Sequence, residues 1–321
     1  MTQSLDVHFR ECAELTRLDL PLAGRLRSAT SDPAALAQVA EDPDVPLRGR
    51  LAAAALLAIC GDPRVPQVPA VLPVPGGNVT IGLPADRVAA VVARWRHVGV
   101  ERPWIEKEVP AWPVHLDDFW LGRYPVTNLQ YLFFLRATRR AGRPGTWYLG
   151  AYPWDRPSHP VSGVAAEDAD EYAAWLSAQT GHPYRLPSEA EWEHAAHGFD
   201  GPEYPWGDEF DPARANTRES GIHTTTPVGV FPAGSGPFGH LDLAGNVEEY
   251  VASQYHPYPG GVPVDDHLTE RLGSYRVARG GSFARYGDLA RTRRRHGAFP
   301  GPLYPCGLRI ATGMPPARSN R

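Results

Sequence analysis

The pattern of apolar and polar positions changes near residue 65, from one typical of helices to one typical of strands and loops. The first part is rich in alanine and leucine, which favour helix. In the segment 31–42, Pro33 suits the first turn of a helix. In the segment 45–64, Gly61 is placed to end a second one. The pattern predicts a helical N-terminal segment over residues 1–65, in which these two helices form a short hairpin.

The next stretch, VPQVPAVLPVPGGNVTIGLP (65–84), is rich in proline, glycine and β-branched residues. This composition is typical of a linker that leads into a first pair of strands. Beyond it, helical periodicity is confined to four segments, 84–99, 126–140, 165–181 and 187–198. After Gly198 the sequence shows only turn signals and short strand patterns. Few helices joined by long proline- and glycine-rich loops predict an α+β fold whose loops bind a ligand.

The overall charge excludes some classes of partner. With 32 basic and 36 acidic residues the net charge is −4, so no field that would attract nucleic acid or an anionic membrane is expected. The longest apolar run, 51–60, is too short to span a bilayer. The N-terminal residues MTQSLDVHFRECAEL lack the apolar core of a signal peptide. A cytoplasmic location is therefore expected.

The three cysteines, Cys12, Cys60 and Cys306, lie far apart and form no CxxC pair. This spacing argues against a thiolate zinc site or a disulfide framework. The sequence also lacks the glycine-rich phosphate-binding loops and the GxSxG nucleophile motif of common enzyme classes. Candidate chemistry must therefore come from a longer pattern.

Six sequence segments, taken in their order along the chain, form such a longer pattern. The phrases are FWLGRYPVTNLQYLFFL, HPVSGVAAEDADEYAAWLSAQTGHPYRLPSEAEWEHAAHG, YPWGDEF, TTPVGVFPAGSGPFGHLDLAGNVEEY, VARGGSF and CGLRIA. In this order, over residues 68–312, they closely resemble the formylglycine-generating enzyme family, also called the sulfatase-modifying factor domain. The resemblance implies a variant C-type-lectin-like fold over residues 66–314, with a small antiparallel sheet, flanking helices and much irregular backbone. Residues 315–321 are expected to form a disordered tail.

The resemblance also implies calcium, a hard cation that collects carboxylate and carbonyl oxygens. A first family site falls on Asp242, Gly245, Val247 and Glu249. A second falls on Asn216, Thr217, Ser220 and Ile222. In the second set Ser220 replaces the family's aspartate and removes a charge, so a structural calcium ion is expected at the first. The alternative is that Asp242 and Glu249 cap turns and pair with arginines.

The redox metals of the family are not supported by the sequence. The family's oxidases bind copper(I) through two cysteines that follow the GGS-aromatic motif, here residues 280–283. Counting from that motif places them at Arg285 and Ala290, and neither side chain can ligate a metal. Cys306, in the closing strand motif, is expected to be an inert core residue. The family's iron-dependent sulfoxide synthases need a His-x3-His-x-Glu motif in an N-terminal bundle, and the N-terminal segment has only His8.

His194 and His197 are three residues apart on the predicted helix 187–198, a spacing that can chelate a metal. No third ligand is evident, so both are expected on the surface or in the wall of a pocket. A facial triad of two histidines and a carboxylate brought together by folding stays open as an alternative.

The segment after the GGS-aromatic motif predicts an altered pocket. Arginine forks hold carboxylate or phosphate groups in a bidentate manner, although about half of the arginines here are expected in internal ion pairs. Glu248 stands where the family has an aromatic residue. The candidate ligand-binding residues are Arg285, Tyr286, Asp288, Arg291, Arg293, Glu248 and Trp206, and further aromatic walls are Trp147, Tyr152 and Trp154.

Three functions are consistent with these residues. The first is a binding or effector module on this fold, which lacks copper catalysis and takes a peptide, a protein or a small anionic ligand. The second is a metal-dependent oxidoreductase of the non-haem iron type, with ligands that differ from the family's. The third is a scaffold whose N-terminal helices dock to another protein and whose pocket is vestigial. The first is the prediction we adopt.

Overall fold

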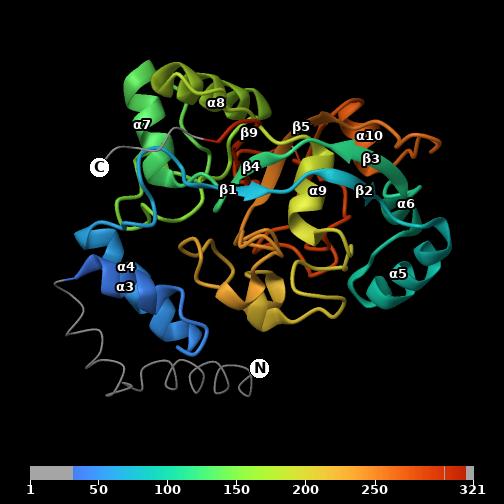
Figure 1. The fold of residues 1–321 in the computed structure, drawn as a ribbon, viewed down its shortest axis with the longest axis horizontal. Coiled ribbons are helices and arrows are strands. Elements are labelled where there is room, and N and C mark those ends of the chain that lie inside the picture. Colours follow the sequence, from blue (N-terminus) through green and yellow to red (C-terminus); the bar gives the residue numbers. More distant parts are fainter. Residues whose placement is uncertain (1–31, 300, 316–321) are drawn as a thin grey trace.

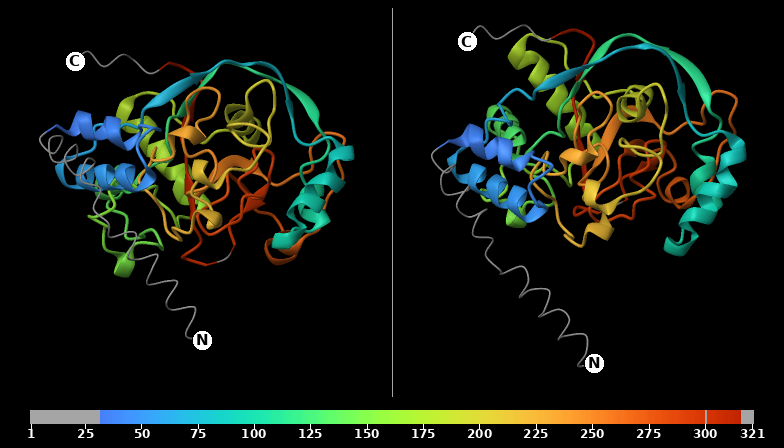
Figure 2. Two further views of the ribbon diagram at one scale, coloured as in Figure 1. Left: turned by 90° about the horizontal axis from the view of Figure 1, so that it is seen from below. Right: turned by 60° about the horizontal axis from the view of Figure 1, so that its bottom comes forward.

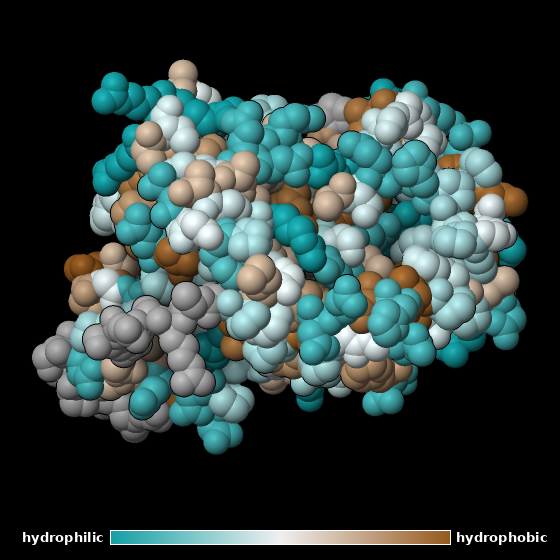
Figure 3. Space-filling model, turned by 45° about the horizontal axis from the view of Figure 1, so that its top comes forward, coloured by the Kyte–Doolittle hydropathy of each residue, from teal (hydrophilic) through white to brown (hydrophobic). Residues whose placement is uncertain are grey.

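The computed structural model describes residues 32–299 and 301–315 of the chain. A helical hairpin lies at one end of the molecule and the helix α5 (Val88–Trp95) at the other, with the sheets between them (Figures 1 and 2). The face in Figure 3 is mostly hydrophilic, and its hydrophobic residues form small separate patches. None of the helices in the described residues is long and apolar enough to cross a membrane.

The hairpin consists of α3 (Pro33–Ala40) and α4 (Leu47–Cys60), which pack against each other. The carboxylate of Asp32 caps α3 by accepting backbone N–H groups of its first turn. Gly61 ends α4 with a φ of +94°, a value that favours glycine. The predicted hairpin is confirmed. The remainder of the predicted helical segment, residues 1–31, lies outside the described residues.

The hairpin packs on the rest of the chain. Leu57 of α4 is buried in one apolar cluster with Phe231. The carboxylate of Glu41, directly after α3, accepts hydrogen bonds from the Tyr124 hydroxyl and from the Arg64 guanidinium. Apolar burial and charge-assisted hydrogen bonds together hold the hairpin in place. Much of its apolar side is therefore already covered by the chain's own domain.

In the described residues the strands form three small sheets. The first contains β1 (Val71–Val74), β4 (Phe119–Gly122) and β9 (Ala311–Thr312), and the second contains β2 (Gly77–Ile81) and β3 (Trp112–Leu116). The third has the order β7 (His296–Gly297), β6 (Arg276–Arg279), β5 (Glu248–Gln254) and β8 (Cys306–Leu308).

The strands of the predicted pair over residues 65–84 do not pair with each other. β1 pairs with β4, where Val74 lies opposite Phe119, and β2 pairs with β3, where Gly77 lies opposite Leu116. The register is the same in both ladders. β1 and β2 are therefore two parts of one long strand that runs antiparallel to β3 and β4. The stretch thus leads into two strands, as predicted, but each finds its partner further along the chain.

The longer helices fall where the periodicity predicts them. They are α5, α7 (Asn128–Thr138), α8 (Ala166–Thr180) and α9 (Glu189–His197). Ser188 is the N-cap of α9 and forms a capping box with Glu191, a pattern that the sequence alone displays. The periodicity does not predict α6 (Arg102–Glu106) or α10 (His267–Leu272), because helices this short carry little periodic signal. The helix α10 corrects the expectation that only turns and strands follow Gly198.

The core lies where the helices meet the third sheet. α7 and α8 bury Phe134 and Tyr172 together with Tyr250 and Leu308 of that sheet. α9 buries Trp192 in a second cluster. The α+β fold predicted from the sequence is confirmed.

Buried arginines support the irregular part of the chain. Arg291 pairs with Glu108, and Arg295 pairs with Glu189, which confirms the prediction of internal ion pairs in this segment. Arg309 donates to three backbone carbonyl oxygens of neighbouring loops. Irregular backbone must still satisfy its buried carbonyl groups. Guanidinium groups, with five donors each, do so here.

Candidate functional site

The GGS-aromatic motif forms a tight turn that sets the position of residue 285. Gly280 and Gly281 have φ values of +89° and +67°, which glycine adopts without strain. A Cβ atom on Gly281 would lie only 2.9 Å from the backbone nitrogen of Ala290. The backbone N–H of Arg285 donates to the carbonyl of Ser282 at 2.9 Å. The turn therefore closes immediately before Arg285 and fixes its backbone.

Arg285 lines a cavity of about 210 Å³ together with Tyr286 and Asp288. Two further arginines, Arg218 and Arg294, lie in the same wall. The remaining polar and aromatic lining comes from Trp104, His267, His296 and Phe299. Burial raises the pKa of Asp288, which weakens the one negative charge among the lining side chains. The excess of positive charge makes the cavity suited to an anion.

A buried carboxylate lies beside Arg285. Glu248, at the start of β5, accepts hydrogen bonds from His296 Nδ1 at 2.8 Å and from the Tyr304 hydroxyl. Arg285 Nε lies 3.9 Å from Glu248 Oε1, and Arg285 Nη2 donates to the Tyr304 oxygen at 3.3 Å. Burial opposes the charge on Glu248, but His296, Arg285 and the Tyr304 hydroxyl hold its pKa below the usual range. Glu248 therefore stays ionised and helps to orient Arg285.

A larger cavity of about 590 Å³ adjoins the same turn. Its aromatic lining consists of Trp147, Tyr148, Tyr152, Trp154 and Phe283. Phe283 is the aromatic residue of the motif and precedes Arg285 by two positions. Trp154 is 76% exposed, so part of this aromatic surface faces solvent. The cavity can take the apolar part of a ligand whose anionic part lies at Arg285.

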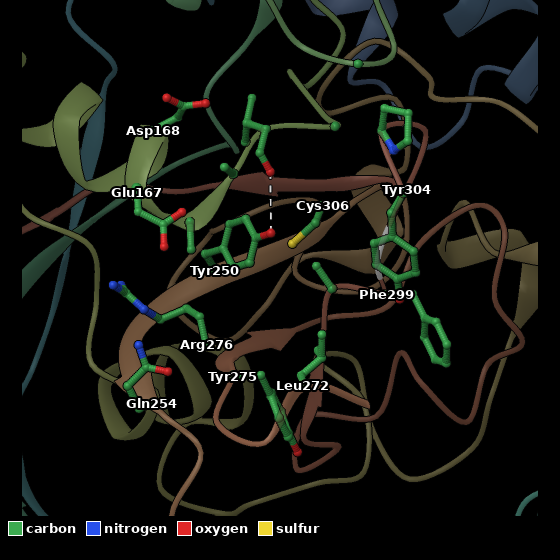
Figure 4. Close-up of a pocket in the computed structure, with 18 of the residues that line it drawn as sticks. Glu167, Asp168, Tyr250, Gln254, Leu272, Tyr275, Arg276, Phe299, Tyr304 and Cys306 are labelled. Atoms are coloured by element: carbon green, nitrogen blue, oxygen red, sulfur yellow. Dashed lines mark hydrogen bonds between the residues drawn. The ribbon is translucent and has the colours of Figure 1, made fainter. Parts of the chain in front are cut away.

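A third cavity, of about 570 Å³, has Tyr304 in its wall and is shown in Figure 4. Glu167, at the start of α8, and Tyr304 lie on opposite sides of the view, with Tyr250 and Cys306 between them. Cys306 is buried in the apolar core, as predicted. Burial raises the pKa of its thiol well above the usual value. The side chain is therefore a neutral thiol and a poor metal ligand.

Three predicted ligand-binding residues lie away from the cavity of Arg285. Arg291 is buried and donates to Glu108 through both Nη atoms. Arg293 donates to backbone carbonyl groups of neighbouring loops. Trp206 stacks on Tyr204, with ring centroids 5.2 Å apart. Internal partners already use these groups, so the structure corrects the prediction for these three residues.

The two carboxylates of the first predicted calcium site differ in the partners that they already have. The carboxylate of Glu249 accepts Arg309 Nη2 at 2.6 Å and Trp192 Nε1 at 2.7 Å. It is thus paired with an arginine, as the alternative interpretation expects. Asp242 accepts the backbone N–H of Gly229 at 2.7 Å, and burial raises the pKa of its carboxyl group to about 6. Its other carboxylate oxygen accepts Asn246 Nδ2 at 3.3 Å. Asp242 therefore has no arginine partner among these hydrogen bonds, whereas Glu249 is paired with Arg309.

The second predicted calcium site adjoins the first, because Asn216 forms a β-bridge with Gly245. Val247 and Gly245 are both buried in this turn. The Ser220 hydroxyl donates to the Asn216 side chain at 3.1 Å and to the carbonyl of Thr217 at 2.7 Å. It occupies oxygens that a calcium ion would need, and Ile222 packs against the helical hairpin. This second set does not fit calcium.

His194 and His197 are buried in α9, so the prediction of a surface position is wrong, and neither lines the three cavities described above. Nδ1 of each lies within 3.2 Å of the Gly198 carbonyl oxygen. His194 Nε2 lies 2.9 Å from the carbonyl of Pro75. The rings satisfy carbonyl groups around the end of the helix. Among residues 32–299 and 301–315 no group of three or more His, Cys, Asp or Glu side chains is placed to hold a metal ion.

Several residues of the cavity are not in the predicted set. Arg218 reaches it because its backbone N–H donates to the carbonyl of Arg285 at 2.8 Å. His296 lines it as well. Its Nδ1 donates to Glu248, which also accepts the Tyr304 hydroxyl. No local sequence signal marks Arg218, because a long loop separates it from the motif. His296 ends the arginine-rich segment from which the sequence predicts the altered pocket. Tyr304 could be suspected only from the burial of an acidic residue at position 248, which demands donors.

Comparison with known proteins places this architecture in a family. A model of the sulfatase-modifying factor enzyme 1-like domain matches residues 59–313. The chain therefore belongs to this family, and the resemblance to formylglycine-generating enzymes is confirmed. The match begins within α4, so it includes the end of the helical hairpin.

Individual relatives carry different names. The chain is 35% identical over 224 residues to the serine/threonine-protein kinase Pkn1 of Chlamydia trachomatis serovar L2, covering 61% of this chain and 33% of the kinase. It is 34% identical over 234 residues to the formylglycine-generating enzyme of Thermomonospora curvata, covering 55% of this chain and 74% of that enzyme. It is 30% identical over 233 residues to the hercynine oxygenase of Mycolicibacterium thermoresistibile, covering 61% of this chain and 51% of that enzyme.

Among solved structures, PvdO from Pseudomonas aeruginosa is similar, with a TM-score of 0.59 and 30% identity. The match covers 76% of this chain and 94% of PvdO. By contrast, the chain spans a third of the kinase and about half of the hercynine oxygenase. The fold and the family are thus shared with proteins of different size and name.

Proposed function

We propose that the chain is a binding or effector module on the formylglycine-generating-enzyme-like fold, and that it acts without copper chemistry. Its ligand is a peptide or small molecule with an anionic group, which Arg285 holds. The observation that carries the proposal is the cavity of Arg285, where three arginines and one carboxyl group share a wall. Guanidinium forks bind carboxylate and phosphate groups in a bidentate manner.

The residues at the family's copper positions support the first part of the proposal. Arg285 and Ala290 stand where the family's oxidases have cysteines. Ala290 is fully buried in an apolar cluster, and Cys306 lines a different cavity. Copper(I) prefers thiolate ligands, so this segment offers it no ligand pair.

The aromatic cavity next to the turn supports the second part. Phe283 lines it, while Ala284 and Arg285 line the smaller cavity. Tyr148 and Trp154 are 83% and 76% exposed, and exposed aromatic groups are enriched where proteins bind partners. A peptide with an acidic residue beside an apolar one would contact both cavities.

A metal-dependent oxidoreductase is the second candidate, and the similarity to hercynine oxygenase favours it. Such an enzyme needs a set of metal ligands. In residues 32–299 and 301–315 no group of three or more His, Cys, Asp or Glu side chains is placed to hold a metal ion. This candidate would therefore have to draw its ligands partly from other residues, and it ranks below the binding module.

The proposal is tested by titrating the full chain with fluorescein-labelled hexaglutamate and with the matching hexaglutamine. The acidic peptide should bind more tightly, and added salt should weaken it because exposed charges are screened. Arg285→Ala should weaken hexaglutamate binding by about tenfold or more, since a hydrogen bond to a charged group contributes roughly 1.5–3 kcal/mol. Arg87→Ala, an exposed arginine outside the cavity, is the matched control. Equal affinity for both peptides, or no effect of Arg285→Ala, would overturn the proposal.

A further inference from the structure

Arg294 is a buried cation with unused hydrogen-bonding capacity. Its side chain is 2% exposed, and its Nη1 donates to the carbonyl groups of Trp104 and Arg295. Its Nε has no hydrogen-bond partner in the described part of the chain. The neighbouring carboxylate oxygens of Asp288 and Glu108 lie 3.5 and 4.0 Å away. Because Nε is itself shielded from solvent, Arg294 contributes its positive charge to the cavity and not a hydrogen bond from Nε to a ligand.

His296 presents a second unused donor position to the same cavity. Its Nδ1 lies 2.8 Å from Glu248 Oε2. An ionised carboxylate can only accept, so Nδ1 carries the proton of the neutral ring. His296 lines the cavity, and both of its hydrogen bonds within the described residues are made by Nδ1. The other nitrogen, Nε2, is therefore the atom left to meet a ligand.

Arg218 adds a solvent-accessible cation to this wall. It is exposed, and its guanidinium carbon lies 4.8 Å from the ring centroid of Tyr286. The stacked ring holds the guanidinium flat while its N–H groups stay free to donate in plane. At about 210 Å³ the cavity is smaller than the roughly 300–1,000 Å³ that drug-sized ligands need. It suits a small anionic group.

We propose that this cavity is an oxyanion-binding site in which Arg218, Arg294 and Nε2 of His296 act together with Arg285, and that the anion binds together with one proton. The inference rests on the proposed function and names its ligand chemistry. In the neutral His296 ring Nε2 carries a lone pair, which would repel an anion that approached this atom. Once Nε2 is protonated, it donates a charge-assisted hydrogen bond.

The groups around His296 set the direction of this linkage. Burial lowers the pKa of His296, and Glu248 counteracts this. The charged or titratable groups that face the ring are Glu248, Arg285, Asp288, Arg294, Tyr304, Lys107 and His267. The positive charges of Arg294 and Lys107 disfavour the imidazolium. A bound anion adds a negative charge beside the ring and so stabilises the imidazolium. Anion binding and proton uptake by His296 therefore favour each other.

The test uses sulfate, a tetrahedral oxyanion that does not itself titrate near neutral pH. Isothermal titration calorimetry of the full chain in two buffers of different ionisation enthalpy gives the number of protons taken up. We expect sulfate to bind with an uptake close to one proton per chain. Arg218→Ala should weaken sulfate binding by about tenfold, while Arg87→Ala should not. Parallel titrations with phosphate and acetate distinguish a tetrahedral ligand group from a carboxylate.

The His296→Gln variant keeps an amide donor but cannot take up a proton. It should bind sulfate without proton uptake, and circular dichroism checks that it folds. If it does not fold, the proton count of the unmodified chain and the Arg218→Ala result still decide. Sulfate binding without proton uptake overturns the role of His296 and leaves the proposed function standing. Failure of sulfate, phosphate and acetate to bind overturns the oxyanion site, whereas the hexaglutamate titration tests the proposed function separately.

Discussion

The carboxylate of Glu41 and the hydroxyl of Tyr124 share a hydrogen bond that joins the helical hairpin to the first sheet. Arg64 and Arg123 donate to the same carboxylate. Burial, together with the charge of Glu41, raises the pKa of Tyr124 well above its usual value, so the phenol remains a donor. The hairpin is therefore fastened to the domain by polar contacts as well as by apolar packing. This arrangement disfavours a scaffold whose N-terminal helices are free to dock elsewhere.

Removal of the Glu41 carboxylate should loosen this attachment. Glu41→Ala leaves the Tyr124 hydroxyl and the Arg123 guanidinium without their partner, and we expect a loss of about 2 kcal/mol in the free energy of unfolding. Urea denaturation measures it. Asp44→Ala, an exposed carboxylate in the adjacent turn, is the control and should change stability by less than about 0.5 kcal/mol. Equal effects of the two substitutions would show that the contact at Glu41 does not hold the hairpin.

The turn before Arg285 gives a second prediction about stability. Gly281 combines a φ of +67° with a close approach of the Leu289 and Ala290 backbone. Gly221 has a similar φ of +73°, but a Cβ atom there would meet nothing within 4 Å. Gly221→Ala should therefore cost about 1–2 kcal/mol for the left-handed backbone alone. Gly281→Ala should cost more, because its methyl group must also displace backbone.

Thermal melting compares the two glycine variants. A lower melting temperature for Gly281→Ala than for Gly221→Ala, with weaker ligand binding at Arg285, is the expected pattern. If both variants melt together, then the close packing of the turn does not constrain Arg285. The interpretation of the GGS motif as a rigid support would then be wrong.

Much of the fold could be predicted because its signals are local. The capping box at Ser188 and the 3.6-residue periodicity around it involve residues only a few positions apart. They predict the helix that the structure contains, α9. The pairing of β1 could not be predicted, because its partner β4 lies far along the chain. Strand pairing depends on tertiary packing, which the period of one segment does not reveal.

The candidate site could be predicted only in part, for a related reason. The motif places Arg285, Tyr286 and Asp288 together, and the structure keeps them in one cavity. The following run RTRRR has no regular secondary structure up to β7, so no period tells which side a given arginine faces. Arg291 consequently pairs inside the core while Arg294 reaches the cavity.

The only lysine of the chain, Lys107, is expected to titrate far below its usual range. Its Nζ is buried 2.6 Å from Asp266 Oδ2. Burial and the nearby Arg294 lower its pKa to about 8, although Asp266 opposes the shift. Labelling with [ε-13C]lysine gives one carbon signal, whose titration should have its midpoint near pH 8 in the folded chain. The chain unfolded in urea is the control and should titrate near the ordinary value of about 10.4.

The same shift predicts how stability depends on pH. Between about pH 8 and pH 10 the folded chain loses the Lys107 proton while the unfolded chain keeps it. This difference at Lys107 alone makes the free energy of unfolding rise with pH by roughly 1 kcal/mol per unit. From about pH 9 upward the tyrosines oppose it, because they ionise in the unfolded chain while burial raises their pKa in the folded chain. A Lys107→Arg variant does not titrate in this range, so the stability of the unmodified chain minus that of the variant should rise between about pH 8 and pH 10.

Calcium should raise the thermal stability of the chain if Asp242 supports a site. The melting temperature is expected to be higher with calcium than with a chelator, because a cation that binds only the folded state stabilises it. Asp242→Asn should abolish the difference, whereas Asp265→Asn, at an exposed position, should preserve it. An identical melting temperature with calcium and with chelator would favour the alternative, in which Asp242 and Glu249 only cap turns and pair with arginines.

The central claim is that a member of this family has a binding cavity where its oxidases hold copper. Elemental analysis of the full chain, purified from cells supplied with copper and iron, tests this claim most directly. The proposed function predicts that copper and iron are each far below one atom per chain, because by the resemblance Arg285 and Ala290 fall at the positions of the copper cysteines. Stoichiometric copper or iron that survives a mild chelator would contradict it and would make an oxidoreductase the better interpretation.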